Sequence, residues 1–305
     1  TIMLAGGLTF AVPGMEPAYA ANANLFVSAE NSQFDNYFAG PMVIEVVVID
    51  SDISDTSEGE GEPDVTVQGK DIRMAQATDG NWYGYFADSD AALAADATQA
   101  ANSGFGLDFG TGCTAASATT VTNVTLSDTV GVFIRGADTG STTAGVLGTC
   151  TDVNAIGTPS MHVIRENKTL NTNTATGNGP GQLGIEENTW PFIQLYDLNP
   201  TGSVVVTYNK GGGAQSTTLT FDTVDQFANL ESDRTVFPTG ANVHLTLTDV
   251  QLNIDPTDED SWTWGTNSSN STVYYQLFTE HGAIDADGTA GSVDLSSDIG
   301  TADFM

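Results

Sequence analysis

Aspartates recur two or three residues apart in four segments of the chain, and this spacing suits a hard divalent cation. Calcium takes about six to eight oxygen ligands, and carboxylates on one turn can converge on a single ion to which the backbone adds carbonyl oxygens. The candidate calcium ligands are Asp50, Asp52, Asp55, Asp88, Asp90, Asp255, Asp258, Asp260, Asp285 and Asp287. None of the segments is an EF-hand loop, because no D-x-[DN]-x-[DN]-G run with a glutamate at its twelfth position occurs. A solvated acidic turn is the alternative for any one segment, and we expect at least one of the four to bind a structural calcium ion.

The chain is strongly acidic: 39 Asp and Glu residues face 7 Lys and Arg residues, for a formal net charge of −32. Nucleic acid is excluded as a partner, because phosphate binding requires cationic side chains and no Lys or Arg precedes Lys70. The partners that this balance implies are cations. Such a surface needs either high salt, which screens its self-repulsion, or bound divalent metal, which neutralises it, and both conditions indicate an extracellular protein.

Residue patterns typical of enzymes are missing from the sequence. The three histidines, His162, His244 and His281, lie far apart, none belongs to an H-E-x-x-H motif, and no G-x-S-x-G segment occurs. The segment Gly179–Gly184 has the letters G-x-G-x-x-G. A dinucleotide loop must follow a strand and open a helix, whereas this segment contains a proline and lies in a polar stretch. We therefore expect a non-catalytic protein.

Two cysteines, Cys113 and Cys150, are expected to form a disulfide, because an isolated pair in a secreted chain usually does so and neither has the CxxC spacing of a metal site. Four Asn-x-Ser/Thr sequons mark candidate glycosylation sites at Asn123, Asn167, Asn267 and Asn270. In a chain so rich in Thr, Ser and Asn some sequons arise by chance, so no single one establishes a glycan.

The N-terminus has the features of a secretory leader. The apolar run Ile2–Val12 is followed by Ala18-Tyr19-Ala20, an A-x-A signal-peptidase pattern. No basic residue precedes the run, so we interpret residues 1–20 as a signal peptide remnant; a buried strand or a short core helix is the alternative. No later stretch approaches the roughly 20 apolar residues of a membrane span, so we expect membrane anchoring only through regions outside this fragment.

Short β-branched and aromatic runs, separated by Gly, Asn and Asp turns, predict strands along most of the chain. The expected strands are Met42–Asp50, Val65–Gln68, Ile72–Ala77, Trp82–Phe86, Thr120–Leu126, Val130–Arg135, Met161–Arg165, Phe192–Tyr196, Val204–Tyr208, Ser216–Phe221, Val243–Thr248 and Val273–Phe278. The Ala-rich stretch Asp90–Ala101 predicts a helix, since Ala has the highest helix propensity. The pattern favours an all-β fold, which we expect to consist of tandem immunoglobulin-like β-sandwich domains with one short Ala-rich helix.

A polar stretch at residues 166–184 suggests how the chain is divided. It has almost no apolar residues, so we expect a linker between a first domain at 21–165 and a second at 185–305 that continues beyond the fragment. The Gly-rich turn at 209–213 is predicted to join two strands of the second domain as a hairpin.

A second hairpin is predicted around Asp79-Gly80, because this dipeptide lies between two apolar runs. Successive side chains of a strand point to opposite faces. The run that follows the turn should therefore place Trp82 and Phe86 on one face of its sheet and Tyr83 and Tyr85 on the other.

Four phrases of the sequence resemble a known family. They are the leader end GMEPAYA, NLFVSAENSQFDNYFAGPMVIEVVVIDSDISDT, PDVTVQGKDIRMAQATDGNWYGYFAD and FPTGANVHLTLTDVQLNIDPTDEDSWTW. They resemble the large surface-layer (S-layer) proteins of ammonia-oxidising (thaumarchaeal) archaea, which are much longer than these 305 residues. The resemblance implies immunoglobulin-like domains assembled into a two-dimensional hexagonal lattice around the cell, acidic and cation-binding, with pores that pass small solutes. It carries over no catalytic residue.

The leading functional hypothesis is structural: a subunit of an extracellular S-layer lattice whose partners are copies of itself and cations, and whose pores pass and enrich small cations such as ammonium. The alternative is a secreted carbohydrate-binding or adhesin module, in which exposed aromatic rings would stack on sugars. The aromatic residues available for that role are Trp82, Tyr83, Tyr85, Trp190, Trp262 and Trp264. Acid distributed along the whole chain favours the lattice, whereas a compact aromatic cluster would favour a glycan reader.

Overall fold

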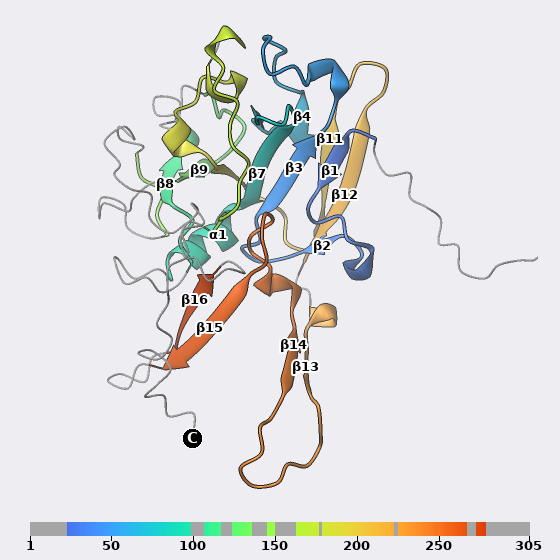
Figure 1. Ribbon diagram of the computed structural model, residues 1–305, viewed down its shortest axis with the longest axis vertical. Helices are drawn as coiled ribbons and strands as arrows, with labels where there is room; N and C mark the ends of the chain where they lie inside the picture. The colour runs from blue at the N-terminus through green and yellow to red at the C-terminus, as the bar shows by residue number, and fades with distance from the viewer. Residues whose placement is uncertain are drawn as a thin grey trace, which may run out of the picture.

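The computed structural model describes residues 23–98, 107–116, 124–135, 145–149, 163–176, 179–222, 225–266 and 273–278. Within these residues the chain is mostly β, with two large sheets and two separate two-stranded ribbons (Figure 1). The expectation of a mainly β fold is confirmed. None of the described helices is long and apolar enough to cross a membrane.

The larger sheet has seven strands and lies at the centre of the molecule. Its order is β1 (Leu25–Val27), β3 (Ile44–Val48), β7 (Trp82–Asp88), β10 (Phe192–Tyr196), β9 (Gly131–Ile134) and β8 (Thr111–Thr114), with β6 (Ala75–Gln76) paired to β7 beside this path. The central pair, β7 and β10, is parallel, and the other pairs are antiparallel.

The second sheet has five strands. Its order is β2 (Tyr37–Phe38), β12 (Gln215–Phe221), β11 (Gly202–Tyr208), β4 (Val65–Val67) and β5 (Lys70–Asp71). Here β2 runs parallel to β12, and the other pairs are antiparallel. Because immunoglobulin-like sandwiches are built from antiparallel sheets, the parallel pair in each sheet is a departure from that expectation.

The central strands of the seven-stranded sheet, β7, β10 and β9, are buried on both faces. On one face Trp82 and Phe86 share a hydrophobic cluster with apolar side chains of the five-stranded sheet, such as Val206. On the other face Tyr83 and Tyr85 share a second cluster with the helix and with the segments around residues 163–190. The predicted alternation of faces is therefore confirmed, and every residue of β7 is buried.

The boundary expected at residues 166–184 does not divide the sheets. Strand β10, from the expected second domain, pairs in parallel with β7 and so lies between strands of the expected first domain. Strand β11, also from the expected second domain, pairs antiparallel with β4 of the first. The segment 166–184 is a cover on the sheet: Leu170 forms an isolated bridge with Ala77 and is buried. Burial of both sheet faces requires such covering segments, which composition alone interprets as a linker.

Both predicted hairpins are confirmed. At Asp79-Gly80 the chain turns between β6 and β7, and Gly80 has a φ of 85° with the position of a Cβ only 2.5 Å from the Ser54 carbonyl oxygen, so a side chain would not fit there. The turn at 209–213 joins β11 to β12 over seven paired residues.

The Ala-rich stretch forms helix α1 (Ser89–Asp96), and its N-cap is Asp88, whose carboxylate accepts a hydrogen bond from the Ala91 amide. Single turns of 3₁₀ helix complete the described secondary structure: η1 (Ser32–Phe34), η2 (Ser51–Ile53), η4 (Thr174–Thr176), η5 (Pro180–Gln182), η6 (Glu187–Thr189), η7 (Asp225–Phe227) and η8 (Val250–Leu252).

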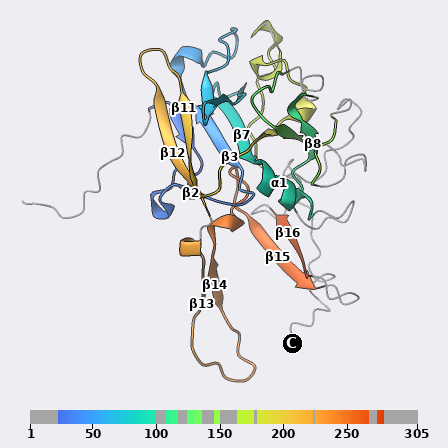
Figure 2. The same ribbon diagram turned by 180° about the vertical axis from the view of Figure 1, so that it is seen from behind.

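Two ribbons leave the same end of the body. One pairs β13 (Asn229–Ser232) with β14 (Leu245–Thr248), and the other pairs β15 (Ser261–Thr266) with β16 (Val273–Phe278). Views from the front and from behind show both ribbons extending away from the two large sheets (Figures 1 and 2).

Replacement of Phe86 tests the importance of the face between the two sheets. The side chain is fully buried and makes edge contacts with the rings of Phe38 and Tyr196. We expect Phe86→Ala to lower the free energy of unfolding by about 3–5 kcal/mol, since it leaves a cavity as well as losing burial. Phe26→Ala is the control, because Phe26 lies in the same sheet but is 42% exposed, and it should cost far less. Equal losses in denaturant unfolding of the two variants would contradict this packing.

Candidate cation sites

The segment that follows β3 carries the best-formed cluster of carboxylates among the described residues. One carboxylate oxygen each from Asp55, Glu58 and Glu60 lies within 4.8 Å of the others. Ser57 donates two hydrogen bonds of 2.7 Å to Asp55 Oδ1, from its amide and its hydroxyl, and these bonds lower the pKa of Asp55. Three converging carboxylates are a suitable beginning for a calcium site, which needs further oxygens from backbone or water.

A buried network of side-chain amides fixes the backbone of this acidic loop. Gln76 Oε1 accepts hydrogen bonds from Asn171 Nδ2 (2.8 Å) and Gln182 Nε2 (2.7 Å). Asn171 in turn donates to the Thr56 carbonyl (3.0 Å), and Gln182 Oε1 accepts from the Glu60 amide (2.9 Å). All three amide side chains are buried. The carboxylates of the loop are therefore presented by a rigid backbone.

The Gly-rich segment 179–184 helps to build this network and shows no sign of a phosphate loop. It forms the short turn η5, follows no strand, and carries Gln182 into the buried amide cluster. On the other side of the loop, a Cβ on Gly59 would lie 2.7 Å from the Thr176 carbonyl oxygen, so only glycine allows this approach. Residues expected to be a linker thus hold the acidic loop in place.

Asp50 and Asp52, at the start of the same segment, pair with the ammonium group of Lys210. Asp50 is buried, and its Oδ2 lies 2.6 Å from Lys210 Nζ and accepts a hydrogen bond of 2.9 Å from the Tyr208 hydroxyl. Asp52 lies 3.6 Å from the same ammonium. Burial acts to raise the pKa of Asp50, but the hydrogen bonds from Lys210, the Asp52 amide and Tyr208 outweigh it and lower the pKa. Asp50 and Asp52 therefore lie with Lys210, whereas Asp55, which was predicted to join them in one calcium site, lies with Glu58 and Glu60.

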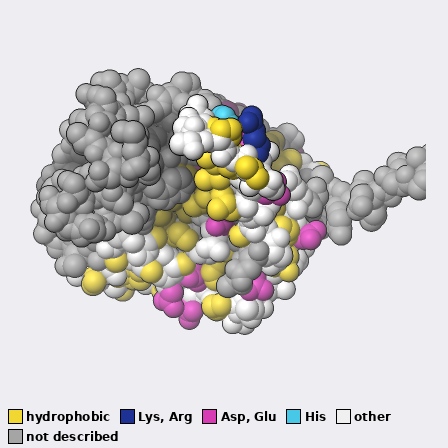
Figure 3. Space-filling view, turned by 90° about the horizontal axis from the view of Figure 1, so that it is seen from below, with side chains coloured by type: hydrophobic (Ala, Val, Ile, Leu, Met, Phe, Trp, Pro, Cys, Tyr) yellow, Lys and Arg dark blue, Asp and Glu magenta, His cyan; other side chains and the backbone are white. Residues whose placement is uncertain are grey.

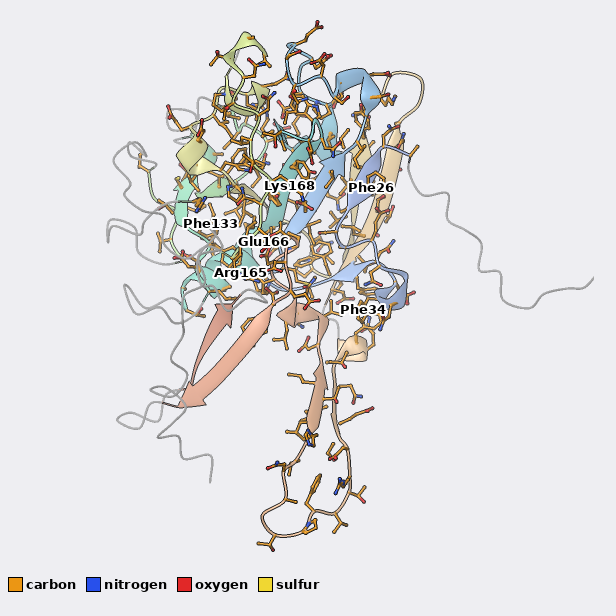
Figure 4. All side chains as sticks on the ribbon, viewed as in Figure 1. Phe26, Phe34, Phe133, Arg165, Glu166 and Lys168 are labelled. Carbon is orange, nitrogen blue, oxygen red and sulfur yellow. The ribbon has the colours of Figure 1, made fainter. Side chains whose placement is uncertain are left out.

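A second internal ion cluster occupies the segment of Asp255 and Asp260. Both carboxylates pair with Arg165, a fully buried side chain that lies at the end of the body from which β15 leaves (Figure 4). Asp255 also accepts hydrogen bonds from the Arg165 amide (2.9 Å) and the Thr257 amide (2.9 Å), and Asp260 accepts from the Ile254 and Asp255 amides. Asp255 and Asp260 are poorly placed to bind calcium, because their oxygens are used by a guanidinium and by backbone N–H groups.

Burial dominates the titration of this cluster. It raises the pKa of Asp255 to about 6, although the charge of Arg165 and the hydrogen bonds to Thr257 act in the opposite direction. Burial also raises the pKa of Asp260, with Arg165 again opposing. The third predicted ligand, Asp258, accepts a hydrogen bond from the Glu259 amide and takes no part in the Arg165 cluster.

Of the remaining predicted ligands, the structure describes Asp88 and Asp90, and they form no common site. Asp88 is buried at the start of α1 and accepts hydrogen bonds from the Ala91 and Leu198 amides, and burial raises its pKa. Asp90 is exposed on the first turn of α1. Asp285 and Asp287 lie outside the described residues, as do His162 and His281.

The predicted disulfide and glycans are only partly within the described chain. No free thiol occurs among the described residues, and Cys113 is buried in β8. Gly148 forms an isolated parallel bridge with Cys113, and Gly148 is two residues before Cys150 in the sequence. Cys150 itself lies outside the described residues. Of the sequons, Asn167 lies on a partly exposed loop, and the others lie outside the described residues: Asn123, Asn267 and Asn270.

The aromatic residues considered for a sugar-stacking face mostly fill the core. Trp82, Tyr83, Tyr85 and Trp190 are all at most 5% exposed. Trp262 is partly buried and donates a hydrogen bond to the Leu252 carbonyl. The described residues therefore offer no cluster of exposed rings that would favour the carbohydrate-binding alternative.

Several residues of these sites were missed by sequence reasoning. Glu58 and Glu60 could have been found by extending the aspartate spacing rule to glutamate, since they lie two apart in the same acidic run. No local sequence pattern marked Arg165, Lys210 or Gln182, because the residues that they contact are distant in sequence.

Comparison with known proteins adds no relative: no protein-family model matches the chain, and a search of curated proteins finds no match. The resemblance to S-layer proteins therefore rests on the sequence phrases alone.

Metal binding by the acidic loop is testable with paired variants. We expect calcium to bind with a dissociation constant of about 0.1–1 mM, as in extracellular calcium modules, and Glu58→Gln/Glu60→Gln to weaken binding at least about tenfold. Glu186→Gln/Glu187→Gln removes the same charge elsewhere on the surface and is the control. Isothermal titration at constant ionic strength measures both, and equal affinities in the two variants would exclude the acidic loop as the site.

The raised pKa of the buried Asp255 predicts that the free energy of unfolding depends on pH. Its pKa is raised from 3.8 to about 6, so between these values the folded state binds more protons than the unfolded state. The contribution of this group to stability is therefore largest at acidic pH and is lost as pH rises through 6. We expect the free energy of unfolding of the wild type, minus that of Asp255→Asn, to fall over this window in urea titrations. Asp258→Asn is the control, and a difference that rises with pH would contradict the assignment.

Proposed function

We propose that this chain is a non-catalytic structural subunit of an extracellular S-layer, which assembles with copies of itself into a two-dimensional lattice and binds cations, calcium among them. The observation that carries the proposal is the distribution of charge. Arg73, Arg165 and Lys210 are all paired with carboxylates of the same chain. Acidic residues outnumber basic ones by 39 to 7 in the whole chain, so the basic residues are too few to neutralise most of the acids.

This distribution determines what the surface can bind. Copies of a chain with net charge −32 repel each other at low ionic strength, and cations from the solution relieve that repulsion. The acidic loop of Asp55, Glu58 and Glu60 offers one place for a divalent ion. An assembly that depends on dissolved cations suits a layer outside the cell.

A layer of such subunits would also act on small solutes. A surface potential of about −30 mV enriches monovalent cations roughly threefold and divalent cations roughly tenfold. Screening limits this effect to about 8 Å at 0.15 M salt, so only narrow pores would benefit. The resemblance to S-layer proteins of ammonia-oxidising archaea suggests what this charge would do: the layer would enrich ammonium and exclude anions.

Assembly is the decisive test of the proposal. We expect the purified chain to form sheet-like arrays in negative stain at several millimolar calcium, and to return to small species when calcium is chelated at the same ionic strength. Magnesium at equal concentration is the control for charge screening alone. A protein that stays monomeric under all three conditions would overturn the proposal.

A further inference from the structure

The ribbon of β13 and β14, residues 229–248, is here called the arm. It projects from the body as a long hairpin and touches neither large sheet along its length (Figure 1). All eight residues of its two strands are exposed. A lone two-stranded hairpin is only marginally stable in water, so an arm with this exposure is expected to gain order from a contact.

The arm has one apolar face. Leu230 lies opposite Leu247 across the ribbon, so their side chains share a face, and Leu245 lies on the same face two residues before Leu247. The opposite face carries polar residues such as Glu231 and Thr246. This alternation is typical of a strand that is covered on one side.

Exposed apolar side chains are concentrated on the arm. Of the nine large hydrophobic residues that are exposed in the described chain, the arm holds five: Leu230, Val236, Val243, Leu245 and Leu247, at 51–79% exposure. Seen from below, hydrophobic side chains gather in the middle of this end of the molecule, beside a Lys or Arg side chain (Figure 3). Contiguous exposed apolar patches of this kind mark interaction surfaces.

A groove of about 530 Å³ lies at the foot of the arm. Leu247 of the apolar face forms one wall, and Leu252 and Trp262 contribute further apolar surface. Three acids, Asp249, Glu259 and Asp260, also line it, and Glu259 is exposed. The groove is therefore apolar along the arm and negative at its rim.

The arm carries little net charge. Between residues 229 and 248 there are two acids, Glu231 and Asp233, and one base, Arg234, so the arm is nearly neutral in a chain of net charge −32. Arg234 lies about midway between the foot and the tip, with 65% of its side chain exposed, and pairs with the neighbouring Asp233 at 3.4 Å. The arm therefore carries little charge that would oppose the approach of an acidic copy.

We propose that two copies of this chain exchange arms: the two apolar faces pack against each other in antiparallel orientation, and the tip of each arm enters the groove at the foot of the other. At about 3.3 Å per residue, the stretch from Asn229 to Pro238 reaches about 30 Å, so antiparallel packing brings each tip to the partner's foot. The leucines of both arms then leave water. The contact is two-fold symmetric and self-complementary. It rests on the proposed function, of which it supplies one subunit contact.

Substitution of the apolar face tests the exchange. We expect Leu230→Ser/Leu245→Ser/Leu247→Ser to raise the dimer dissociation constant at least about tenfold in sedimentation experiments with the full chain. The matched control is Phe26→Ser/Ile49→Ser/Val130→Ser, which removes three hydrophobic residues of 42–45% exposure from the body and should dimerise like the wild type. Unchanged melting temperatures would show that both variants remain folded. Equal dimerisation of the two variants, or a wild type that is monomeric at all concentrations, would overturn the proposal.

Cross-linking tests the geometry. When Val236→Cys and Glu259→Cys chains are mixed and oxidised, we expect a covalent dimer that contains one chain of each kind. Neither chain alone should give the same yield. A cross-link only between two Val236→Cys chains would mean that the tips meet each other, and would overturn the entry of the tip into the groove.

The outcomes separate this inference from the proposed function. Arrays that form normally from the Leu230→Ser/Leu245→Ser/Leu247→Ser variant would exclude the arm while leaving the layer intact. Dimers that cross-link as expected, but never grow into arrays with calcium, would support the arm and exclude the layer.

Discussion

The fold depends on one constraint: the central sheet has to bury both of its faces. Every residue of β7 is buried, with Trp82 and Phe86 against the second sheet and Tyr83 and Tyr85 against the helix and loops on the other side. A sheet exposed on one face could have been completed by neighbouring residues alone. Here each cover combines segments that are distant in sequence, such as β4 with β11 on one face and α1 with Trp190 on the other, and β10 completes the sheet by pairing in parallel with β7. The chain consequently folds around one sheet and its cover layers.

This burial decides what happens to the acidic residues. A carboxylate taken out of water loses more than a single ion pair returns unless its other lone pairs also find donors. Asp255 and Asp260 meet that condition through Arg165 and several backbone amides, and Glu62 meets it through Arg73 and the Met74 amide. Their raised pKa values show that compensation is incomplete. Arg73, Arg165 and Lys210 are therefore paired with acids that folding has buried wholly or in part, which leaves few basic residues for the exposed acids.

Sequence reasoning succeeded where the relevant signal was local. The hairpin at Asp79-Gly80, the faces of β7 and the strand at Phe192–Tyr196 follow from turn chemistry and alternation within a few residues. It failed where the deciding contact was distant. Segment 166–184 is polar and so was expected to be a linker, yet its amides bind the loop near Thr56 more than 100 residues away. The aspartate clusters were likewise interpreted by spacing, whereas the position of Arg165 and Lys210 determines which carboxylates remain free.

The same imbalance restricts how copies of the chain can meet. Screening confines electrostatic repulsion to about 8 Å at 0.15 M salt, so two acidic bodies can lie in one assembly if their surfaces stay farther apart than this. A contact made directly between the bodies would bring many exposed acids within that distance and would need a bound cation for each close pair. A contact made through a nearly neutral arm, about 30 Å long, keeps the bodies apart and limits the charges at the interface to a few. The length of the arm and its low charge therefore address one problem, the association of strongly like-charged subunits, and a cation site such as the acidic loop would be needed only where two bodies come closer together.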